Sequence, residues 1–462
     1  MRRIIALVVL AIASLLQINS TRAAGSFFLH DGDRVCFYGD SITEQRFYPV
    51  AVETYVLTRF PKLKVDFVDS GVGGDRVTGG WAGNINERLK RDVYPFKPTV
   101  VTIMLGMNDA SYRPFDQKIF DTYKKGYLHI VDALQKHLPG VRIVILGPSP
   151  FDDITQKPRF SGGYNAVLQR YDQFDKKLAA EHHLYYVDFN APMVDVIKKL
   201  QAAQPQFAGQ VVPGRVHPSP AGELLMAAAL LKLWQAPATV SRVSISGDTV
   251  NQAVNTHISN LRAAHGLISW TQLDQSLPFP MLSLHAVWPQ FFGENRERGP
   301  QPNFKFINEP AAAIIHAGHL YRKLDHEILQ VKGLAAEHYK LTINDQPVGI
   351  FSATDLATGI NLAKYRTPML VQAYHILAMA WDRTQMRFYA WRQIQLPAEG
   401  YDTWWGGPRV EVTGFSQAVR HRIMSNAERL AHSIYSSLTL MLNDERAAAV
   451  PATDHYELTP VK

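Results

Sequence analysis

The sequence predicts an α/β fold whose parallel sheet is covered by helices on both faces. Between residues 33 and 235, short runs of β-branched and apolar residues alternate with longer amphipathic runs, as in repeated βα units. Hydrophobic residues make up 46% of the chain, which is enough for a large core. Because its 462 residues exceed one average domain, we expect two globular units.

Five strands and one clear helix define the first unit. The expected strands are residues 34–38, 65–68, 99–105, 141–146 and 184–189. In the helix expected at residues 120–138, apolar residues recur at steps of three and four, namely Tyr123, Tyr127, Ile130, Val131 and Leu134. These side chains form one stripe, so we expect this helix to pack on the sheet.

The pattern changes near Pro237, where we place the boundary of the first unit. Residues 239–245 alternate valine with serine, and the turn Gly247-Asp248 follows, which is typical of a strand that ends in a turn. The further strands expected in this unit are residues 285–288, 338–343 and 348–352, and the expected helix is residues 310–324. Residues 344–347, Asn-Asp-Gln-Pro, join the last two strands as a hairpin-like turn. This unit is therefore expected to be α+β.

Two amphipathic helices, at residues 369–395 and 417–443, are expected to finish the fold and to pack back on the first domain. The charged fraction of 19% is low, so we expect disorder only in the tail at residues 447–462. The chain is thus divided into a signal peptide at 1–24, an α/β domain at 25–237, an accessory α+β region at 238–366 and C-terminal helices at 367–462.

The N-terminus has the three-part layout of a secretory signal peptide. Met1-Arg2-Arg3 is followed by an apolar run at residues 4–16 and by small residues that end at Ala23-Ala24-Gly25. The apolar run is shorter than the about 20 residues that span a bilayer, which favours a cleaved leader over a membrane anchor. Cleavage after Ala24 and cleavage after Ala23 are both compatible with this layout. We therefore expect a secreted or periplasmic protein with no stable membrane span after the leader is removed.

Cysteine content, charge and histidine spacing argue against several classes of function. Cys36 is the only cysteine, so no intramolecular disulfide forms, and its apolar strand favours a buried residue over a reactive thiol. The net charge is +7, but no basic run interleaves with aromatic residues, so no nucleic-acid partner is expected. His182-His183 lacks companions at ligand spacing and His326-Glu327 lacks a second histidine, so we expect neither a metal nor another cofactor.

A Gly-Asp-Ser sequence at residues 39–41 follows the first expected strand and precedes a helical stretch. It therefore lies at the carboxyl end of a parallel strand, where open α/β sheets bind ligands and where the next helix directs its N–H groups. Ser41 is a candidate nucleophile at this position. Alternatively, Asp40 and Ser41 only cap the helix, because aspartate and serine are favoured N-caps.

Two further loops follow the second and third strands. Residues 71–74 are Gly-Val-Gly-Gly, and glycine allows a backbone N–H to approach a ligand without a Cβ in the way. In residues 106–109, Gly-Met-Asn-Asp, Asn108 can offer a side-chain N–H to a developing oxyanion, a contribution of about 3 to 4 kcal/mol in comparable sites. Each loop can also be an ordinary turn, and the glycine spacing fits neither a phosphate-binding loop nor a dinucleotide fingerprint.

His217 lies in a loop ahead of an apolar helix. Pro218 disfavours a helical conformation at His217, while Ser219 and Pro220 suit the N-cap and the first helical position. We therefore expect the imidazole to face the ends of the strands, where the other three loops also lie. Four modest signals in one domain together predict one site.

These four blocks resemble those of the SGNH or GDSL hydrolases, which are Gly-Asp-Ser, an isolated Gly, Gly-x-Asn-Asp and Asp-x-x-His-Pro. The resemblance covers residues 37–233 and implies a three-layer α/β/α sandwich with a flavodoxin-like parallel sheet. The roles that it implies are Ser41 as nucleophile, His217 as general base, and the Ser41 amide, Gly74 and Asn108 as oxyanion donors, with Gly73 as the alternative to Gly74. Residues 339–373 resemble the C-terminal portion of larger bacterial members of the family.

The chain departs from the family pattern at one position. Three residues before His217 stands Gly214, where the family has the aspartate that orients the histidine. Replacing that acid by asparagine in a serine protease lowers turnover about 10⁴-fold. Three explanations are open: a backbone carbonyl holds the imidazole, a carboxylate from elsewhere such as Asp188 or Asp195 does so, or activity has been lost. We favour a Ser–His pair that is supported by a carbonyl.

We therefore predict an exported serine ester hydrolase that acts on a small-molecule or polysaccharide ester, with an O-acetylated carbohydrate as the favoured substrate. A lipid ester is less favoured because no long apolar lid-like helix is evident. The alternatives are an acyltransferase that uses the same residues and a catalytically impaired carbohydrate-binding protein, which Gly214 motivates. Trp81 and Trp404-Trp405 can stack on sugar rings, although core packing or docking between domains is the commoner use of such residues.

Overall fold

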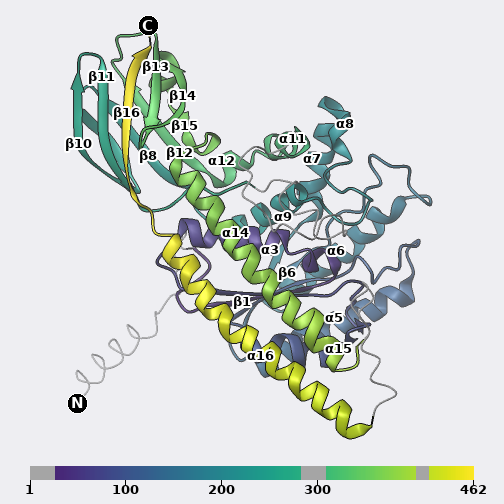
Figure 1. Ribbon diagram of the computed structural model, residues 1–462. Coiled ribbons are helices and arrows are strands. Elements are labelled where there is room, and N and C mark those ends of the chain that lie inside the picture. Colours follow the sequence, from purple (N-terminus) through teal and green to yellow (C-terminus); the bar gives the residue numbers. More distant parts are fainter. Residues whose placement is uncertain (1–26, 282–308, 402–415, 462) are drawn as a thin grey trace, which may run out of the picture.

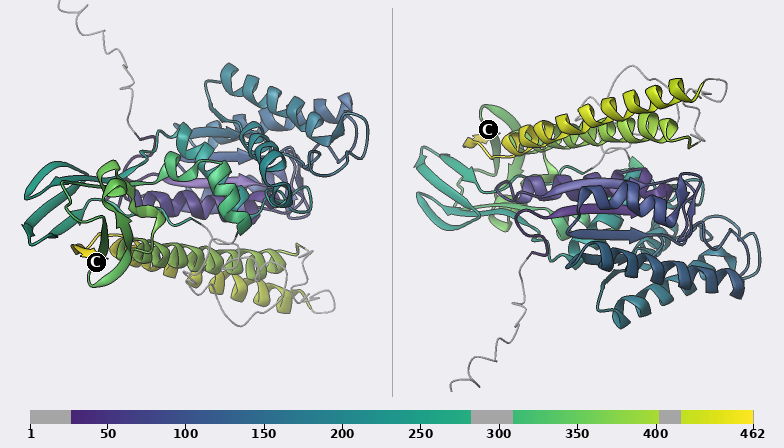
Figure 2. Two further views of the ribbon diagram at one scale, coloured as in Figure 1. Left: turned by 90° about the horizontal axis from the view of Figure 1, so that it is seen from above. Right: turned by 90° about the horizontal axis from the view of Figure 1, so that it is seen from below.

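The computed structural model describes residues 27–281, 309–401 and 416–461 (Figure 1). The predicted signal peptide, the predicted strand at 285–288 and Trp404-Trp405 lie outside these residues. Within them, an α/β domain carries a β-rich lobe at one end and a pair of long helices along one side (Figures 1 and 2).

A five-stranded parallel sheet forms the centre of the α/β domain, with the strand order β2-β1-β5-β6-β7. The strands are β1 (Arg34–Gly39), β2 (Asp66–Gly71), β5 (Val100–Met104), β6 (Arg142–Leu146) and β7 (Tyr185–Val187), and each overlaps one of the five predicted strands. The inner strands β1, β5 and β6 are almost fully buried, as expected for strands that helices cover on both faces. Because β1 pairs in parallel with both β2 and β5, the carboxyl ends of these three strands lie together.

Helices cover both faces of this sheet and give the predicted α/β/α sandwich. α3 (Phe47–Arg59) and α9 (Pro220–Leu233) pack against each other on one face, while α5 (Gln117–His137) and α6 (Gly163–Glu181) cover the other (Figure 2). The predicted apolar stripe of α5 is buried, so that prediction is confirmed. The shorter elements of the domain are α2 (Ser41–Glu44), β3 (Gly79–Gly80), β4 (Gly83–Asn84), α4 (Ile85–Arg88), η1 (Leu89–Val93), η2 (Tyr94–Phe96), α7 (Asn190–Ala203) and α8 (Pro205–Ala208).

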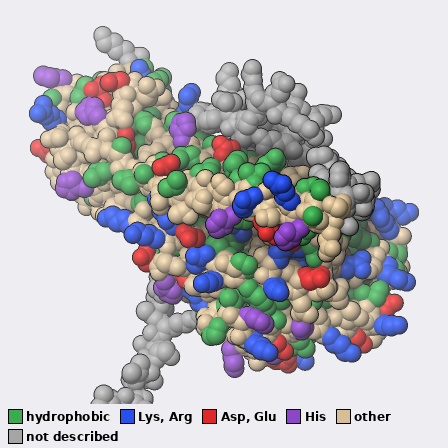
Figure 3. Space-filling view, turned by 60° about the horizontal axis from the view of Figure 1, so that its bottom comes forward, with side chains coloured by type: hydrophobic (Ala, Val, Ile, Leu, Met, Phe, Trp, Pro, Cys, Tyr) green, Lys and Arg blue, Asp and Glu red, His purple; other side chains and the backbone are tan. Residues whose placement is uncertain are grey.

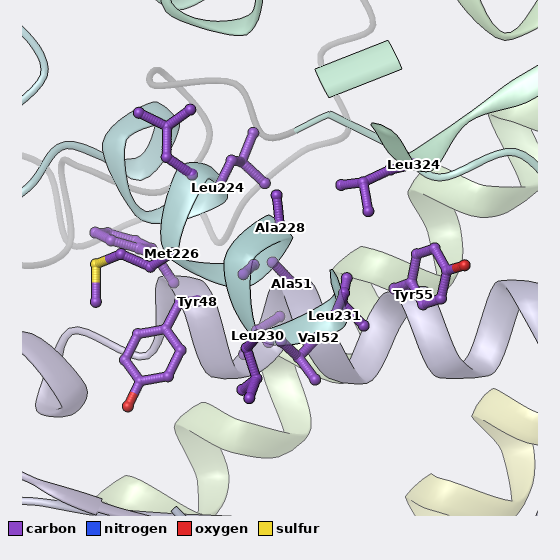
Figure 4. Close-up of a cluster of buried hydrophobic side chains, with 14 of the residues drawn as sticks. Tyr48, Ala51, Val52, Tyr55, Leu224, Met226, Ala228, Leu230, Leu231 and Leu324 are labelled. Atoms are coloured by element: carbon purple, nitrogen blue, oxygen red, sulfur yellow. The ribbon is translucent and has the colours of Figure 1, made fainter. Parts of the chain in front are cut away.

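The contact between α3 and α9 fixes the loop that carries His217. Tyr48 and Val52 of α3 lie against Leu230 and Leu231 of α9, and all four side chains are buried (Figure 4). Most residues of α9 are buried, as expected for a helix that is apolar on every side. Because the His217 loop leads directly into α9, this packing sets the position of the loop relative to β1.

The β-rich lobe consists of two sheets, with the orders β10-β11-β16-β13-β14 and β15-β12-β8-β9. The strands are β8 (Thr239–Ser246), β9 (Thr249–Val254), β10 (Thr256–Ala264), β11 (Leu267–Asp274), β12 (His326–Lys332), β13 (His338–Ile343), β14 (Gln346–Ser352), β15 (Ile360–Asn361) and β16 (Thr453–Val461), and the lobe also contains α13 (Ala353–Thr358) and η4 (Leu362–Lys364). Burial alternates along β11, β12 and β13, so one face of each strand lies on the core. β8, β13 and β14 confirm three of the predicted strands.

The predicted disorder of the C-terminal tail is wrong. The tail forms β16, which lies between β11 and β13 and pairs antiparallel with both. Its inward side chains alternate with polar ones, and Tyr456 stacks on Trp270 with ring centroids 4.9 Å apart. Polar residues on the outward face give this strand the composition of a disordered tail, although its inward face belongs to the core. The chain segment that follows the predicted C-terminal helices is therefore a strand of the β-rich lobe.

The helix predicted at residues 310–324 is divided in two. α11 (Glu309–Ala317) ends before Gly318, and α12 (Leu320–Leu324) begins after His319, whose φ of 53° is left-handed. A Cβ at Gly318 would lie 2.5 Å from Cδ2 of Leu225 on α9. The chain therefore turns where it meets the α/β domain.

Two long helices run antiparallel along the α3 side of the α/β domain (Figures 1 and 2). α14 (Pro368–Tyr389) continues through η5 (Ala390–Gln395) and α15 (Leu396–Ala398), and α16 (Gln417–Ala448) returns beside it; we call these four elements the helical arm. Arg383 of α14 binds Glu53 of α3 and lies 2.8 Å from Glu445 of α16, and all three side chains are buried. This ion triad attaches the arm to the α/β domain.

Replacing Arg383 by methionine is expected to lower the free energy of unfolding by about 3 to 5 kcal/mol, because Glu53 and Glu445 would stay buried without a counter-charge. Urea unfolding followed by circular dichroism measures the change. The control is Arg429→Met on the exposed face of α16, for which we expect a change below about 0.5 kcal/mol. Equal unfolding midpoints for Arg383→Met and the wild type contradict a stabilising role of the triad.

Charged side chains are spread over the surface but gather inside the molecule near one edge of the parallel sheet. On the face shown in Figure 3, Lys and Arg lie scattered among acidic and uncharged side chains. No helix in the described part of the chain is long and apolar enough to cross a bilayer. Buried carboxylates and amides lie instead beside the carboxyl ends of β1, β2 and β5.

Candidate active site

Asp40 caps the helix that follows β1 and leaves Ser41 free. Oδ1 of Asp40 accepts a hydrogen bond from the backbone N–H of Ile42 at 3.0 Å. Ser41 is the first residue of α2, directly after the carboxyl end of β1. Glycine is required at Gly39, because a Cβ there would lie 2.8 Å from the carbonyl oxygen of Met104. The capping interpretation therefore applies to Asp40, and the Ser41 hydroxyl remains available.

His217 meets Ser41 at the carboxyl edge of the sheet. Its Nε2 lies 2.8 Å from the Ser41 Oγ, within hydrogen-bond distance. Ser219 holds the loop as the N-cap of α9, because its hydroxyl accepts from the Gly222 N–H at 3.1 Å. Burial lowers the pKa of His217 below its usual value, which favours the neutral imidazole. A neutral imidazole beside a hydroxyl can act as its general base.

Asn108 connects the loops that follow β1 and β2. Its Nδ2 lies 3.2 Å from the carbonyl oxygen of Asp75 and 3.4 Å from Oδ2 of Asp40. Its Oδ1 accepts a hydrogen bond from the Tyr112 hydroxyl at 2.9 Å, which fixes the amide with its N–H groups toward these loops. The side chain therefore joins the three loops on which the predicted oxyanion donors lie.

Gly74, rather than Gly73, has a free backbone N–H at this site. The Gly73 N–H donates to Oε2 of Glu44 at 2.7 Å and is therefore already bound. The Gly74 N–H has no hydrogen-bond partner within the described ranges, and the residue is exposed. Its φ of 79° lies in the left-handed region that favours glycine. The geometry thus favours Gly74 over Gly73 as an oxyanion donor.

A buried ion network supports this loop, and sequence reasoning missed most of it. The fully buried Arg88 donates through Nε to Asp75 at 2.7 Å and also binds Asp92. Asp109 holds the loop from the other side, since its Oδ1 accepts from the Val77 N–H at 2.9 Å. Burial raises the pKa of Asp109 to about 7 and that of Asp75 to about 6. Asp109 belongs to the Gly-x-Asn-Asp block, in which only Asn108 was assigned a role, and no local pattern marks Arg88 as buried.

Comparison with known proteins decides the family of the α/β domain. Residues 37–225 match the model of the GDSL-like Lipase/Acylhydrolase family. This region is a GDSL-like acylhydrolase domain. All four predicted blocks lie within the match, so the family assignment covers the same loops that meet at Ser41, Asn108 and His217.

Two proteins similar to this chain differ in how much of it they cover. An acetylxylan esterase from Geobacillus stearothermophilus is 28% identical over an alignment of 222 residues, and the match covers 44% of this chain and 93% of that protein. A solved structure described as a gut microbial diltiazem-metabolizing enzyme is 25% identical with a TM-score of 0.75, and the match covers 94% of this chain and 98% of that one. The match to that structure therefore extends beyond the α/β domain to the β-rich lobe and the helical arm.

Among the residues that the structure describes, none supplies the acid that Gly214 lacks beside His217. No residue in the described part of the chain accepts a hydrogen bond from the His217 Nδ1. Asp188 instead accepts from the Ala191 N–H at 2.9 Å, and Asp195 pairs with Lys199 at 2.7 Å on an exposed face. Neither candidate carboxylate therefore orients the imidazole, and the carbonyl support that we favoured is not found among these residues.

The loop before His217 leaves space where the family has its acid. Gly214 is exposed with a φ of 71°, and Arg215 follows with a φ of 77°. The guanidinium of Arg215 turns toward the loop that follows β6, where it donates to the carbonyl oxygen of Asp152 at 3.2 Å. An ideal Cβ at Gly214 would meet no atom of the described residues within 4 Å. Steric crowding therefore does not exclude a carboxylate at this position.

The pH dependence of kcat/KM should report the lowered pKa of His217. A general base must be unprotonated, so activity that depends on His217 is expected to fall as the pH drops through this pKa and the ring gains a proton. Because burial lowers the pKa, we expect the acidic limb of the GDSL-like domain to have its midpoint below about pH 6.5. Initial rates with an uncharged ester across the acidic and neutral range measure this midpoint. A midpoint above about pH 7 contradicts a desolvated, uncompensated histidine.

Proposed function

We propose that the protein is an exported serine ester hydrolase that removes O-acyl groups, above all acetyl, from a carbohydrate. The observation that carries the proposal is the 2.8 Å separation of the Ser41 Oγ and the His217 Nε2. The lowered pKa of His217 supports its role as a base. The Gly74 N–H has no partner among the described residues, and Asn108 Nδ2 is the second donor that we assign, which would give up one of its long contacts with Asp75 and Asp40 to bind the oxyanion.

The proposed reaction is acyl transfer through a serine ester. Nε2 of His217 takes the Ser41 proton while Oγ attacks the carbonyl carbon, and the Ser41 and Gly74 amides with the Asn108 side chain donate to the oxyanion. His217 then gives its proton to the departing sugar oxygen, which leaves the acyl group on Ser41. Water, deprotonated by His217, attacks this acyl group, and the carboxylic acid and free Ser41 are released.

Two observations support a carbohydrate ester outside the cytoplasm. The 28% identical relative is an acetylxylan esterase, and it covers the share of the chain that a GDSL-like domain occupies. The N-terminal sequence has the layout of a secretory signal peptide, which would deliver the enzyme to polysaccharide in the periplasm or outside the cell. The larger relative is named for diltiazem metabolism, so diltiazem belongs among the substrates to test.

The test combines turnover with covalent labelling. Purified protein is assayed for acetate release from acetylated xylan, 4-nitrophenyl acetate and diltiazem, with a long-chain 4-nitrophenyl ester as the lipid-like comparison. A fluorophosphonate probe, which reacts with activated serines, is expected to label the wild type and to leave Ser41→Ala unlabelled. Preference for the long-chain ester overturns the carbohydrate assignment. Faster acyl transfer to an added sugar than to water would assign an acyltransferase instead.

A second candidate function is binding of an acylated carbohydrate without catalysis. The observation in its favour is that the described residues offer no acceptor to the His217 Nδ1, where the family has an acid. This candidate predicts neither turnover nor probe labelling in the wild type, but retarded migration of the protein through gels that contain acetylated xylan. Turnover that depends on Ser41 excludes it.

A further inference from the structure

Arg392 of the helical arm lies against the loop that carries Gly74. It belongs to η5, outside the family match at residues 37–225. Its Nε lies 3.2 Å from Oε1 of Glu44, and its guanidinium carbon lies 3.9 Å from the ring centroid of Trp81. The residue is 2% exposed, so both contacts are shielded from water. An arginine of the helical arm thus touches two residues of the GDSL-like domain.

Glu44 and Trp81 hold Gly73 through the two peptides on either side of it, and Trp81 binds the one that continues into Gly74. Oε2 of Glu44 accepts from the Gly73 N–H at 2.7 Å, and Nε1 of Trp81 donates to the Gly73 carbonyl oxygen at 2.8 Å. That carbonyl belongs to the same planar, trans peptide as the Gly74 N–H, so the two groups point in opposite directions. Binding the carbonyl therefore fixes the direction of the Gly74 N–H.

Arg392 is placed to fix both partners at once. Burial raises the pKa of Glu44, and the charge of Arg392 opposes that rise by favouring the carboxylate that binds the Gly73 N–H. Nη1 and Nη2 of Arg392 have no hydrogen-bond partner in the part of the chain that the structure describes. Next to this contact, Val72 of the loop packs in one buried cluster with Trp391 of the arm.

We propose that Arg392 is a positioning residue for ester hydrolysis. It holds Gly73 in place through Glu44, which binds the Gly73 N–H, and through Trp81, which binds the Gly73 carbonyl oxygen and so sets the Gly74 N–H. This inference rests on the proposed function. It gives the helical arm a role in the reaction, because the arm then completes the support of one oxyanion donor. The effect falls mainly on the transition state, where the negative charge on the carbonyl oxygen develops.

The kinetic test compares Arg392→Met with Arg392→Lys on 4-nitrophenyl acetate. Removing an oxyanion donor costs about 10² to 10³ in kcat, so a donor that is present but loosened should cost about 10-fold. We expect KM to change less than about threefold, because this donor binds the ground state weakly. Arg392→Lys keeps the charge without the guanidinium plane and should recover part of kcat.

Two variants of the same arm are matched controls. Arg429→Met removes an exposed arginine of α16, and Arg383→Met weakens the attachment of the arm through its buried ion triad. Both are expected to keep kcat close to the wild-type value at a temperature where they are folded. An unchanged kcat in Arg392→Met overturns the inference. An equal loss in Arg383→Met overturns it as well, because the effect would then belong to docking of the arm in general.

Hydrogen exchange separates this inference from the proposed function. Mass spectrometry of peptides that cover residues 70–80 reports the opening of the loop whether or not an ester is hydrolysed. We expect faster exchange in Arg392→Met than in the wild type and in Arg429→Met. If the wild type shows no turnover, the proposed function fails, while faster exchange still supports the positioning of the loop by Arg392. Equal exchange in all three proteins overturns the inference.

Discussion

Alanine in place of Ser41 is expected to lower kcat at least about 10²-fold, and alanine in place of His217 by a similar factor. The hydroxyl and the imidazole act as one unit, because 2.8 Å separates Oγ from Nε2. In a subtilisin triad, losing the serine or the histidine costs about 10⁶-fold and losing the acid about 10⁴-fold. Dividing the first factor by the second leaves a rate contribution of about 10²-fold for a Ser–His pair without an acid. This is the arrangement in the described part of the chain.

The double variant tests whether the two residues work together. We expect Ser41→Ala combined with His217→Ala to lose no more activity than either single variant, because each change removes the same step. Steady-state hydrolysis of 4-nitrophenyl acetate measures the loss, with Ser161→Ala in an exposed loop as the control. If the loss in the double variant equals the product of the two single losses, Ser41 and His217 do not act in the same step. A loss of about 10⁶-fold in a single variant would show that another group orients His217.

Local sequence was sufficient to predict the α/β domain and the place of its site. The first three blocks each follow a strand, and a parallel sheet collects the carboxyl ends of its strands at one edge. The proline and N-cap pattern around His217 placed the imidazole in a loop ahead of α9, as the structure has it. Topology then brings Ser41 and His217 into contact across 176 positions of sequence.

Features that depend on distant partners could not be predicted. Arg88 is fully buried only because Asp75 and Asp92 neutralise it, and no local pattern marks an arginine for such surroundings. The contact of Arg392 with Glu44 joins the helical arm to the segment after β1, two parts of the chain that are far apart in sequence. β16 was missed for a related reason: its alternation is short and half polar, and it becomes evident only beside β11 and β13.

Aspartate in place of Gly214 is expected to raise kcat, because it restores a carboxylate three residues before His217. The position has room, since an ideal Cβ meets no atom of the described residues within 4 Å. Its φ of 71° lies in the left-handed region, which aspartate and asparagine enter more readily than other residues, at a cost of about 1 to 2 kcal/mol. This cost is expected to lower the stability of the fold without crowding the new side chain.

The expected gain in kcat lies between about 10-fold and 10⁴-fold, the upper value being the cost of losing the acid in a serine protease. The new carboxylate fixes the tautomer of His217 and stabilises the imidazolium that forms when Ser41 attacks. It should also raise the pKa of His217, so the acidic limb of kcat/KM moves to higher pH than in the wild type. Gly214→Asn has nearly the same shape and the same tolerance of a left-handed φ but no charge, and should move neither kcat nor the limb.

Measured together, kcat and the acidic limb separate the charge of the new side chain from its effect on the loop. A gain that is confined to Gly214→Asp and accompanied by a limb at higher pH identifies His217 as the base and its missing partner as the limit on turnover. A gain shared by Gly214→Asn would come from the altered loop, because asparagine carries no charge. If the limb of Gly214→Asp stays where it is in the wild type, the carboxylate does not reach the imidazole, and a gain in kcat would then have another cause.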